Sequence, residues 1–322
     1  MTHPDLVKRL SAARPTPEDL NAAWPARQRS ELWDRIDAAS ATPAGRRGRR
    51  AALVAAAVVA AMAAPTMMSS GDASARADLL RLSLVAAQSD GRVITPGTYL
   101  HVKTESVHDN SSLFGDGETL DTDREPWTRW DGAMWAVDTR PSEGWTDYHR
   151  FAPPIRPSLG HPTPEFVDGL PDDATALRAY LDDVVWGSGS HQEALFVAIV
   201  DLAHTRMLDP ATFAVALDVL AHVDGVETRD VLVDGREAVE IRFDSHFGLR
   251  LFGHQSLTVD RATAQVLLVA ESDPGGTYES RTTLVEVVDT IPPDVVAVYD
   301  KYGDGVRLCE DGQEAIGDGI CP

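Results

Sequence analysis

An uncharged, alanine-rich run extends from Ala51 to Gly71 and follows directly on four arginines at positions 46, 47, 49 and 50. As an α-helix this run spans roughly 31 Å, close to the hydrocarbon thickness of a bilayer. Because the basic residues flank its N-terminal side, the positive-inside rule predicts that residues 1–50 stay in the cytoplasm and that the rest is exported. The sequence therefore predicts a single-pass protein of the cell membrane.

Two other interpretations of the run stay open. Most of its residues are Ala and Val, which favour insertion only weakly, and Pro65 and Thr66 interrupt its outer end. Ala73-Ser74-Ala75 is a small-residue sequence at which a signal could be cleaved, although a signal peptide does not normally begin so far ahead of its apolar core. A buried helix of a soluble protein is the third interpretation, and such a helix normally carries charge on one face.

The balance of charge changes sign at the same place. Residues 1–50 carry ten Lys or Arg and six Asp or Glu, whereas the remaining chain carries nineteen and forty-four. An acidic exported part argues against direct contact with nucleic acid or with an anionic membrane surface. It suits solubility in an environment rich in cations.

Composition and turn signals predict five segments. They are a cytoplasmic helical segment at 1–50, a transmembrane helix at 51–71, a linker and helix at 72–91, an extracytoplasmic α+β domain at 92–291, and a C-terminal tail at 292–322. The tail holds both cysteines of the chain, Cys309 and Cys321. In an oxidising compartment they are expected to form a disulfide, worth about 3 kcal/mol in the loop-entropy model. Two free thiols are the alternative.

The cytoplasmic segment has the pattern of short amphipathic helices. Thr16-Pro17-Glu18-Asp19 supplies an N-cap, a proline at the first helical position and acidic residues in the first turn. Fifty residues can hardly bury two tryptophans against themselves, so a partner surface is a reasonable interpretation. The predicted partner-binding residues are Leu20, Trp24, Leu32, Trp33 and Ile36. A loosely helical tether beside the membrane is the alternative.

The exported part alternates between strand and helix patterns. Ser69–Ala75 is expected to be a small-residue linker, followed by a helix at Ala77–Ala87 and a strand at Tyr99–Thr104. Asp131-Gly132 is typical of a hairpin turn, and a proline-rich stretch at 151–171 is expected to be irregular. Three helices are then expected, at Asp173–Val185, Gln192–Met207 and Ala211–Ala221, before strands at Val226–Val233, Ala238–Phe243, Leu249–Val259, Val266–Glu271 and Ser280–Val288.

Four tryptophans form the densest aromatic group in the exported part. Trp127, Trp130, Trp135 and Trp145 alternate with polar residues on predicted strands, so several could share one face of a sheet. A core packed against the helices is one interpretation. A groove for a hydrophobic ligand, or an aromatic platform for a sugar, is the other, and on it these four residues are the predicted ligand-binding set.

Patterns that would indicate catalysis or metal binding are incomplete in this sequence. The histidine and glutamate at 161 and 165 lie in a proline-rich loop rather than on a helix, and Ser190 fits an N-cap better than a nucleophile. Asp300, Asp304 and Asp311 have the spacing of a calcium loop, but Tyr302 stands where an oxygen ligand is needed. We therefore expect a protein that is not an enzyme, with no catalytic residues, no metal site and no cofactor.

The order of several short motifs resembles a known family. The motifs are the arginine cluster before the alanine-rich run, PGTYLHVKT at 96–104, WDG at 130–132, LPDDATALRAYL at 170–181, ALFVAIVDL at 194–202 and LTVD at 257–260. Together they resemble an actinobacterial family of single-pass membrane proteins that are often encoded beside extracytoplasmic-function sigma factors. The resemblance covers most of residues 1–290.

The resemblance implies an anti-sigma-like regulator, with a sigma factor as its cytoplasmic partner and an unknown ligand in the envelope. Zinc-binding anti-sigma domains use a His-x3-Cys-x2-Cys pattern, whereas residues 1–50 contain His3 and no cysteine, so a zinc site is excluded there. The order of sheet and helices is also similar to envelope proteins whose open half-barrel holds lipid. The alternative function is accordingly a carrier of lipid or another hydrophobic ligand on a passive membrane tether.

The expected fold is α+β. An exported antiparallel sheet, which could curve into an open half-barrel, carries a helical insert and is preceded by one transmembrane helix.

Overall fold

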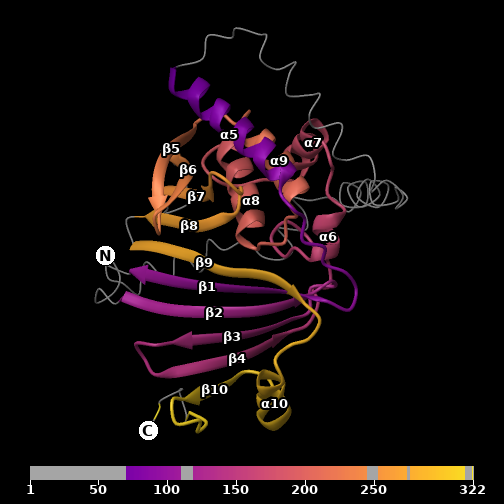
Figure 1. Cartoon of the computed structure of the whole chain (residues 1–322), viewed down its shortest axis with the longest axis vertical. Coiled ribbons are helices and arrows are strands. Elements are labelled where there is room, and N and C mark those ends of the chain that lie inside the picture. The colour runs from indigo at the N-terminus through magenta and orange to yellow at the C-terminus, as the bar shows by residue number, and fades with distance from the viewer. Residues whose placement is uncertain (1–69, 110–118, 245–252, 274–275, 316–320, 322) are drawn as a thin grey trace, which may run out of the picture. The chain divides into compact units, whose positions relative to one another are not determined.

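The computed structural model describes residues 70–109, 119–244, 253–273, 276–315 and 321. Within these residues ten strands form one antiparallel sheet in the order β10-β4-β3-β2-β1-β9-β8-β7-β6-β5, with helices beside it (Figure 1). The α+β arrangement with an antiparallel sheet is therefore confirmed. No helix in this part of the chain is long and apolar enough to cross a membrane. Apart from Ser70 and Gly71, the predicted span lies outside the described residues.

The chain runs through two groups of strands with helices between them. The first strands are β1 (Tyr99–Asp109), β2 (Thr119–Arg129), β3 (Met134–Arg140) and β4 (Trp145–Phe151). The later strands are β5 (Val226–Val233), β6 (Arg236–Asp244), β7 (His254–Asp260), β8 (Val266–Asp273), β9 (Gly276–Val288) and β10 (Val306–Cys309). The helices are α5 (Ser70–Gln88), α6 (Pro164–Asp168), α7 (Ala174–Val184), α8 (His191–His204), α9 (Pro210–Leu220) and α10 (Pro293–Tyr302).

Long-range pairing of β1 with β9 joins the two groups of strands into one sheet. The register runs from Tyr99 opposite Val288 to Asp109 opposite Thr277, with an irregularity after Lys103. At the far edge, β10 pairs with β4, so part of the C-terminal tail belongs to the same sheet. The helices of the main core lie beside β5 to β8, while β1 to β4 and β10 extend the sheet away from that core, with α10 beside β10 (Figure 1).

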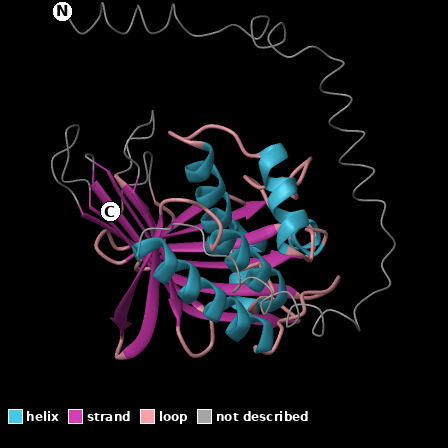
Figure 2. Cartoon of the chain, turned by 90° about the horizontal axis from the view of Figure 1, so that it is seen from above, coloured by secondary structure: helices cyan, strands magenta, loops and turns pink. Residues whose placement is uncertain are grey.

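The main core lies between the helices and one face of β5–β8. Figure 2 shows the helices grouped together against the strands. In α8, Leu195, Phe196 and Ile199 are fully buried, and they belong to the same apolar cluster as Ile241 on β6 and Leu257 on β7. Each side chain of this size stabilises the fold by about 1.5–3 kcal/mol through its burial. The face of the sheet that carries Ile241 and Leu257 is called the helix side below.

The three helices of the insert begin where the sequence predicts. The N-cap residues Asp173, Ser190 and Asp209 each accept a hydrogen bond from the backbone N–H three positions later, at 2.8, 3.1 and 2.7 Å. Such caps satisfy one of the free N–H groups of the first turn and contribute about 1 kcal/mol each.

Helix α5 differs from the expected linker, because the helix already begins at Ser70. Ala75, Leu79 and Leu82 are buried on the face of α5 that packs along α9. The Ser83 hydroxyl donates a hydrogen bond to the Ala214 carbonyl of α9 at 2.8 Å. The small residues that look like a linker in the sequence thus allow close packing of one helix on another.

Three elements appear where the sequence suggests loops or a tail. Strand β2 begins at Thr119, and its polar first half forms a strand because it pairs with β1. Helix α6 lies inside the proline-rich stretch and is capped by Thr163. Helix α10 is fixed by Tyr299, whose hydroxyl donates to the carbonyls of Ala136 and His149 at 3.0 and 2.9 Å. These elements are stabilised by partners that are distant in the sequence, which local patterns do not report.

Candidate functional site

The predicted tryptophans divide between the two faces of the sheet. Trp127 on β2 and Trp135 on β3 are direct cross-strand partners, so both lie on the same face of the sheet. Trp145 on β4 stands opposite Arg140, which lies five positions beyond Trp135 on the same strand and therefore on the other face. Trp130 lies in the turn between β2 and β3. The four residues are not assembled into one aromatic platform.

Each of the two buried tryptophans has polar or charged neighbours of its own. Trp127 stacks on the His101 ring, with 4.7 Å between centroids. Trp145 has the guanidinium groups of Arg307 and Arg140 over its ring, at 3.5 and 4.8 Å. Cation–π contacts of this kind stabilise by about 0.5–2 kcal/mol. These contacts give both tryptophans a packing role.

His101 is a buried polar residue that the sequence reasoning did not single out. Its Nδ1 lies 2.9 Å from Glu286 on β9, and its Nε2 lies 2.7 Å from Glu125 on β2. Lys103 also pairs with Glu125, at 2.9 Å. His101 thus links three adjacent strands through side chains. The alternating pattern of β1 was the available signal, because it places residue 101 on the face of Trp127.

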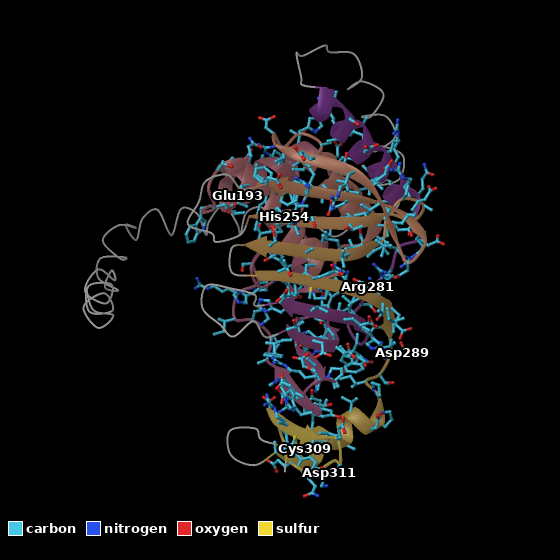
Figure 3. All side chains as sticks on the ribbon, turned by 90° about the vertical axis from the view of Figure 1, so that its left-hand side faces the viewer. Glu193, His254, Arg281, Asp289, Cys309 and Asp311 are labelled. Atoms are coloured by element: carbon cyan, nitrogen blue, oxygen red, sulfur yellow. A yellow bond between two sulfur atoms is a disulfide. The ribbon has the colours of Figure 1, made fainter. Side chains whose placement is uncertain are left out.

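The predicted disulfide between Cys309 and Cys321 is present. Cys309 ends β10 at the outer edge of the sheet (Figure 3). Its backbone N–H donates to the Gln313 carbonyl at 2.9 Å, which closes a turn. The disulfide therefore holds the end of the chain against the edge strands.

The spacing that suggested a calcium loop is not assembled as one. Asp304 accepts a hydrogen bond from the Arg150 backbone at 2.6 Å, and Asp311 accepts from the Gln313 backbone and side chain. In the described ranges, no group of three or more His, Cys, Asp and Glu is placed to hold a metal ion.

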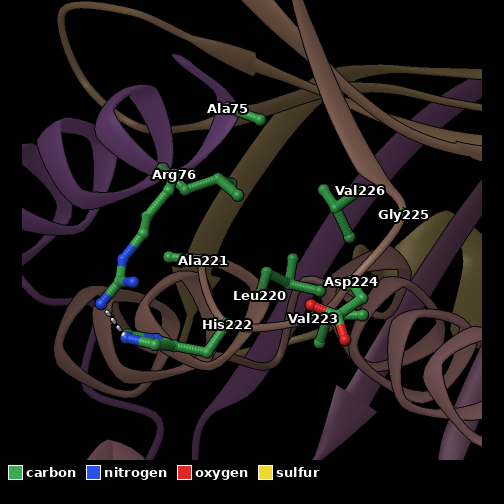
Figure 4. A pocket seen from close by; sticks show the side chains of 10 residues that line it. Ala75, Arg76, Leu220, Ala221, His222, Val223, Asp224, Gly225 and Val226 are labelled. Atoms are coloured by element: carbon green, nitrogen blue, oxygen red, sulfur yellow. Dashed lines mark hydrogen bonds between the residues drawn. The ribbon is translucent and has the colours of Figure 1, made fainter. Parts of the chain in front are cut away.

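A pocket of about 330 Å³ opens beside the first turns of α5 (Figure 4). Its apolar wall comes from Ala75 and Leu79 on α5, Leu220 and Val223 at the end of α9, and Val226 at the start of β5. Its polar rim is formed by Arg76, His222 and Asp224. A volume of this size is at the lower end of small-molecule sites. The pocket thus lies at the joint between α5 and the body of the domain.

Hydrogen bonds fix the state of the histidine on the rim. Arg76 Nη2 lies 2.7 Å from His222 Nε2, and His222 Nδ1 lies 2.8 Å from the Asp218 carbonyl. Since a guanidinium can only donate, Nε2 must accept, and Nδ1 must carry the proton. Arg76 forms no ion pair with a carboxylate among the described residues, although its charge acts to lower the pKa of Asp218. The pocket can therefore hold a small apolar group that ends in a polar or anionic atom.

Gly225 shapes the floor of the pocket. Its φ of +87° lies in the left-handed region, and a Cβ there would approach the Phe243 ring to 3.2 Å. A glycine is required at this position for both reasons.

Comparisons with known proteins give no close relative. No family model matches the chain, and no curated protein matches it. Similar solved structures include MucB in complex with MucA(peri), at 13% identity and a TM-score of 0.27, where the match covers 68% of this chain and 58% of that chain. A lipoprotein-sorting protein domain from Vibrio parahaemolyticus matches at 10% identity and a TM-score of 0.24, covering 68% and 96% of the two chains.

The lipoprotein LppX from Mycobacterium tuberculosis matches at 13% identity and a TM-score of 0.24, covering 67% of this chain and 96% of that chain. TM-scores below 0.5 do not establish a common fold. The function of this chain therefore has to be inferred from its own residues.

Proposed function

We propose that this chain is a membrane-anchored regulator without enzymatic activity. Its α+β domain senses a ligand outside the cytoplasm, and residues 1–50 contact a cytoplasmic partner, for which the family resemblance suggests a sigma factor. The observation that carries this proposal is the docking of α5. The helix that continues from the predicted membrane span is part of the core of the domain.

Docking of α5 separates a regulator from a domain on a passive tether. A passive tether needs only a flexible linker after the membrane. Here α5 is helical from Ser70, buries Leu79 and Leu82, and donates from Ser83 to α9. Asp78 also accepts a hydrogen bond from Thr228 on β5 at 3.0 Å. A movement of the domain would therefore be passed to the predicted span through a stiff helix.

The pocket at this joint supplies a means of control. Ala75, Arg76 and Leu79 form one of its walls, so a ligand in the pocket touches α5 directly. A ligand shifts an equilibrium only by its difference in affinity between two states. A ligand that binds only while α5 is docked would stabilise the docked state, and its release would favour undocking.

The cytoplasmic half of the proposal is tested by capture of the partner. The full chain is co-expressed with an extracytoplasmic-function sigma factor from the same genome and then purified. We expect the sigma factor to co-purify, and Trp24→Ala combined with Trp33→Ala to abolish the capture. Trp186→Ala is the matched control, because Trp186 is 91% exposed and belongs to the α+β domain. Absence of capture, or capture unchanged by the double substitution, would refute this half.

The coupling is tested by interrupting α5. Insertion of Gly-Gly-Ser between Gly71 and Asp72 breaks the helix at its start without touching the buried face. The readout is expression from a promoter that depends on the captured sigma factor. We expect that, with the insertion in α5, expression from this promoter no longer responds to docking or ligand binding in the α+β domain. The same insertion after Gly312, in an exposed turn, should leave that response unchanged. Equal results from both insertions would favour a passive tether.

An envelope carrier remains the second candidate, because the sheet extends beyond the helices. Among the described elements, the helices of the main core pack on β5–β8, and β1–β4 continue past them. Native mass spectrometry of the purified full chain distinguishes the two. Co-purified lipid would favour the carrier, and an empty chain that still captures its partner would favour the regulator.

A further inference from the structure

A buried arginine without a carboxylate lies where the helices meet strand β9. Arg206 follows the end of α8 and is only 5% exposed. Its Nε donates to the Thr282 hydroxyl on β9 at 2.7 Å, where its Nη2 also donates, and its Nη1 donates to the Ala203 carbonyl at 2.7 Å. All these acceptors are neutral. No described Asp or Glu forms an ion pair with this guanidinium.

The charged group that acts on Arg206 among the described residues is another arginine, Arg92, rather than a carboxylate. Burial lowers the pKa of Arg206 to about 9. Of its neighbours, Tyr278 raises this pKa and the positive charge of Arg92 lowers it further. Burial, Arg206 and Arg124 together lower the pKa of His204 to about 4. Arg206 is thus charged and His204 neutral at pH 7. Arg92, half-buried between α5 and β1, has no hydrogen-bond or ion-pair partner in the described ranges.

The sheet offers hydroxyl groups in the same place. Ser280 on β9 is the cross-strand partner of the core residue Val269, so it lies on the helix side together with Thr282. Thr282 is opposite Thr104 on β1, and Thr104 is opposite Arg124 on β2. One row across three strands therefore presents two hydroxyls and a second guanidinium beside Arg206.

Arg124 has one partner and remains open on its other side. Its Nη1 lies 3.5 Å from Asp138 on β3, and its side chain is 43% exposed. The Asp138 carboxyl is itself largely buried, and burial raises its pKa. This carboxylate neutralises Arg124 in part but is not in contact with Arg206.

A purely structural role explains only part of this arrangement. Arg206 caps the end of α8 through the Ala203 carbonyl, and a positive charge at a helix C-terminus is favourable. Neutral hydrogen-bond acceptors compensate only in part for the loss of hydration when a charge is buried without a counter-ion. In the same sheet Arg229, Arg281 and Arg307 each pair with a carboxylate. Arg206 differs from these three arginines because its hydrogen-bond acceptors are neutral and it has no counter-ion among the described residues.

We propose that Arg206, Arg92 and Arg124, with the hydroxyls of Thr104 and Thr282, bind the phosphate group of a ligand on the helix side of β9. Guanidinium groups bind phosphate through paired hydrogen bonds, and hydroxyls add donors. The same chemistry is presented by free inorganic phosphate and by the headgroup of an anionic lipid. This site is distinct from the pocket beside α5, and the inference goes beyond the proposed function because it adds a second place at which the domain binds a ligand.

The test is thermal unfolding of the purified full chain with three probes. These are inorganic phosphate, dihexanoyl phosphatidylglycerol below its micelle concentration, and sodium chloride at matched ionic strength. At a hundred times the dissociation constant, a bound anion should raise the melting temperature by about 5–10 °C. A shift with inorganic phosphate indicates a free-anion site, and a shift with the lipid alone indicates a headgroup site.

Three variants make the result specific. Arg206→Gln should abolish the shift in melting temperature. Arg92→Gln should weaken the affinity for the anion at least tenfold. Because Arg92→Gln leaves the end of α8 intact, it tests the site even if Arg206→Gln fails to fold. Arg281→Gln is the matched control, because Arg281 is on the opposite face of β9 and pairs with Asp234. Figure 3 shows Arg281 on the strand that carries Thr282. It should leave the shift unchanged.

Two results would overturn the site. One is a shift no larger than that with chloride for both phosphate probes. The other is an equal shift in the Arg92 variant and in the parent. Because no sigma factor enters this measurement, the anion site and the proposed regulatory role can fail independently of each other.

Discussion

Docking of α5 onto the domain can be measured with paired leucine substitutions. Leu79 and Leu82 are 1% and 2% exposed, so each loses a fully buried side chain on replacement by alanine. Leucine-to-alanine changes at such sites cost about 2.7–5 kcal/mol, and the cost grows with the cavity that remains. Leu79 lines the open pocket, so water can fill the space it leaves. We expect about 3 kcal/mol for Leu79→Ala and about 4 kcal/mol for Leu82→Ala.

The assay is thermal unfolding of the full chain, followed by the near-ultraviolet signal of the buried Trp127 and Trp145. For a domain of this size, about 3 kcal/mol lowers the melting temperature by roughly 6–12 °C. Arg81→Ala is the control on the same helix, because its side chain is 71% exposed, and it should change stability by less than about 0.5 kcal/mol. A cost below about 1 kcal/mol for either leucine would show that α5 is not docked.

Three further predictions concern other parts of the domain. A Cβ at Gly132, where φ is +88°, would overlap the Thr163 methyl group, whereas a Cβ at Gly97 would meet no other atom. Urea denaturation should therefore show a loss of stability of about 3 kcal/mol for Gly132→Ala and of about 1 kcal/mol for Gly97→Ala. Equal losses for the two variants would contradict the packing of Gly132 against Thr163. The folded pKa of His204, about 4, is below its ordinary value near 6.5. Its neutral form is favoured by folding, so its contribution is complete above pH 6.5 and is lost towards pH 4, by up to roughly 3 kcal/mol. A stability–pH profile of His204→Gln should be flatter in that window, and an unchanged slope would contradict this. Replacing Cys309 and Cys321 by serine should remove about 3 kcal/mol locally, seen as faster amide exchange in β10 with β5–β8 unchanged. Unchanged amide exchange in β10 would contradict the inference that the disulfide stabilises this strand.

Local sequence patterns predicted the structure correctly wherever the partners of a residue lie within its own turn or strand. The N-cap at Ser190 was predicted from the sequence because an N-cap bonds only three residues ahead. The hairpin at Asp131-Gly132 was readable for the same reason, since its turn needs a glycine at positive φ. The disulfide followed from there being only two cysteines.

The candidate sites were not readable in this way. The pocket wall joins residues 75–79 to residues 220–226, and the cationic site joins β1, β2 and β9 to the end of α8. A weak signal was present for Arg206, because it is a single basic residue between two strongly apolar helical segments. Such a residue is usually solvated, so only its burial distinguishes it.

The sequence by itself determined the α+β class, the helix starts of the insert and the pairing of the cysteines, because these depend on contacts within a few residues or on composition. The tertiary structure alone decided that small residues after position 70 form a docked helix, that the tryptophans lie on opposite faces of the sheet, and that Arg206 is buried without a counter-ion among the described residues. Each of these outcomes depends on which distant surfaces are buried together. Burial energy is set by contacts across more than a hundred residues of chain, as between Ser83 and Ala214, and no local pattern encodes it.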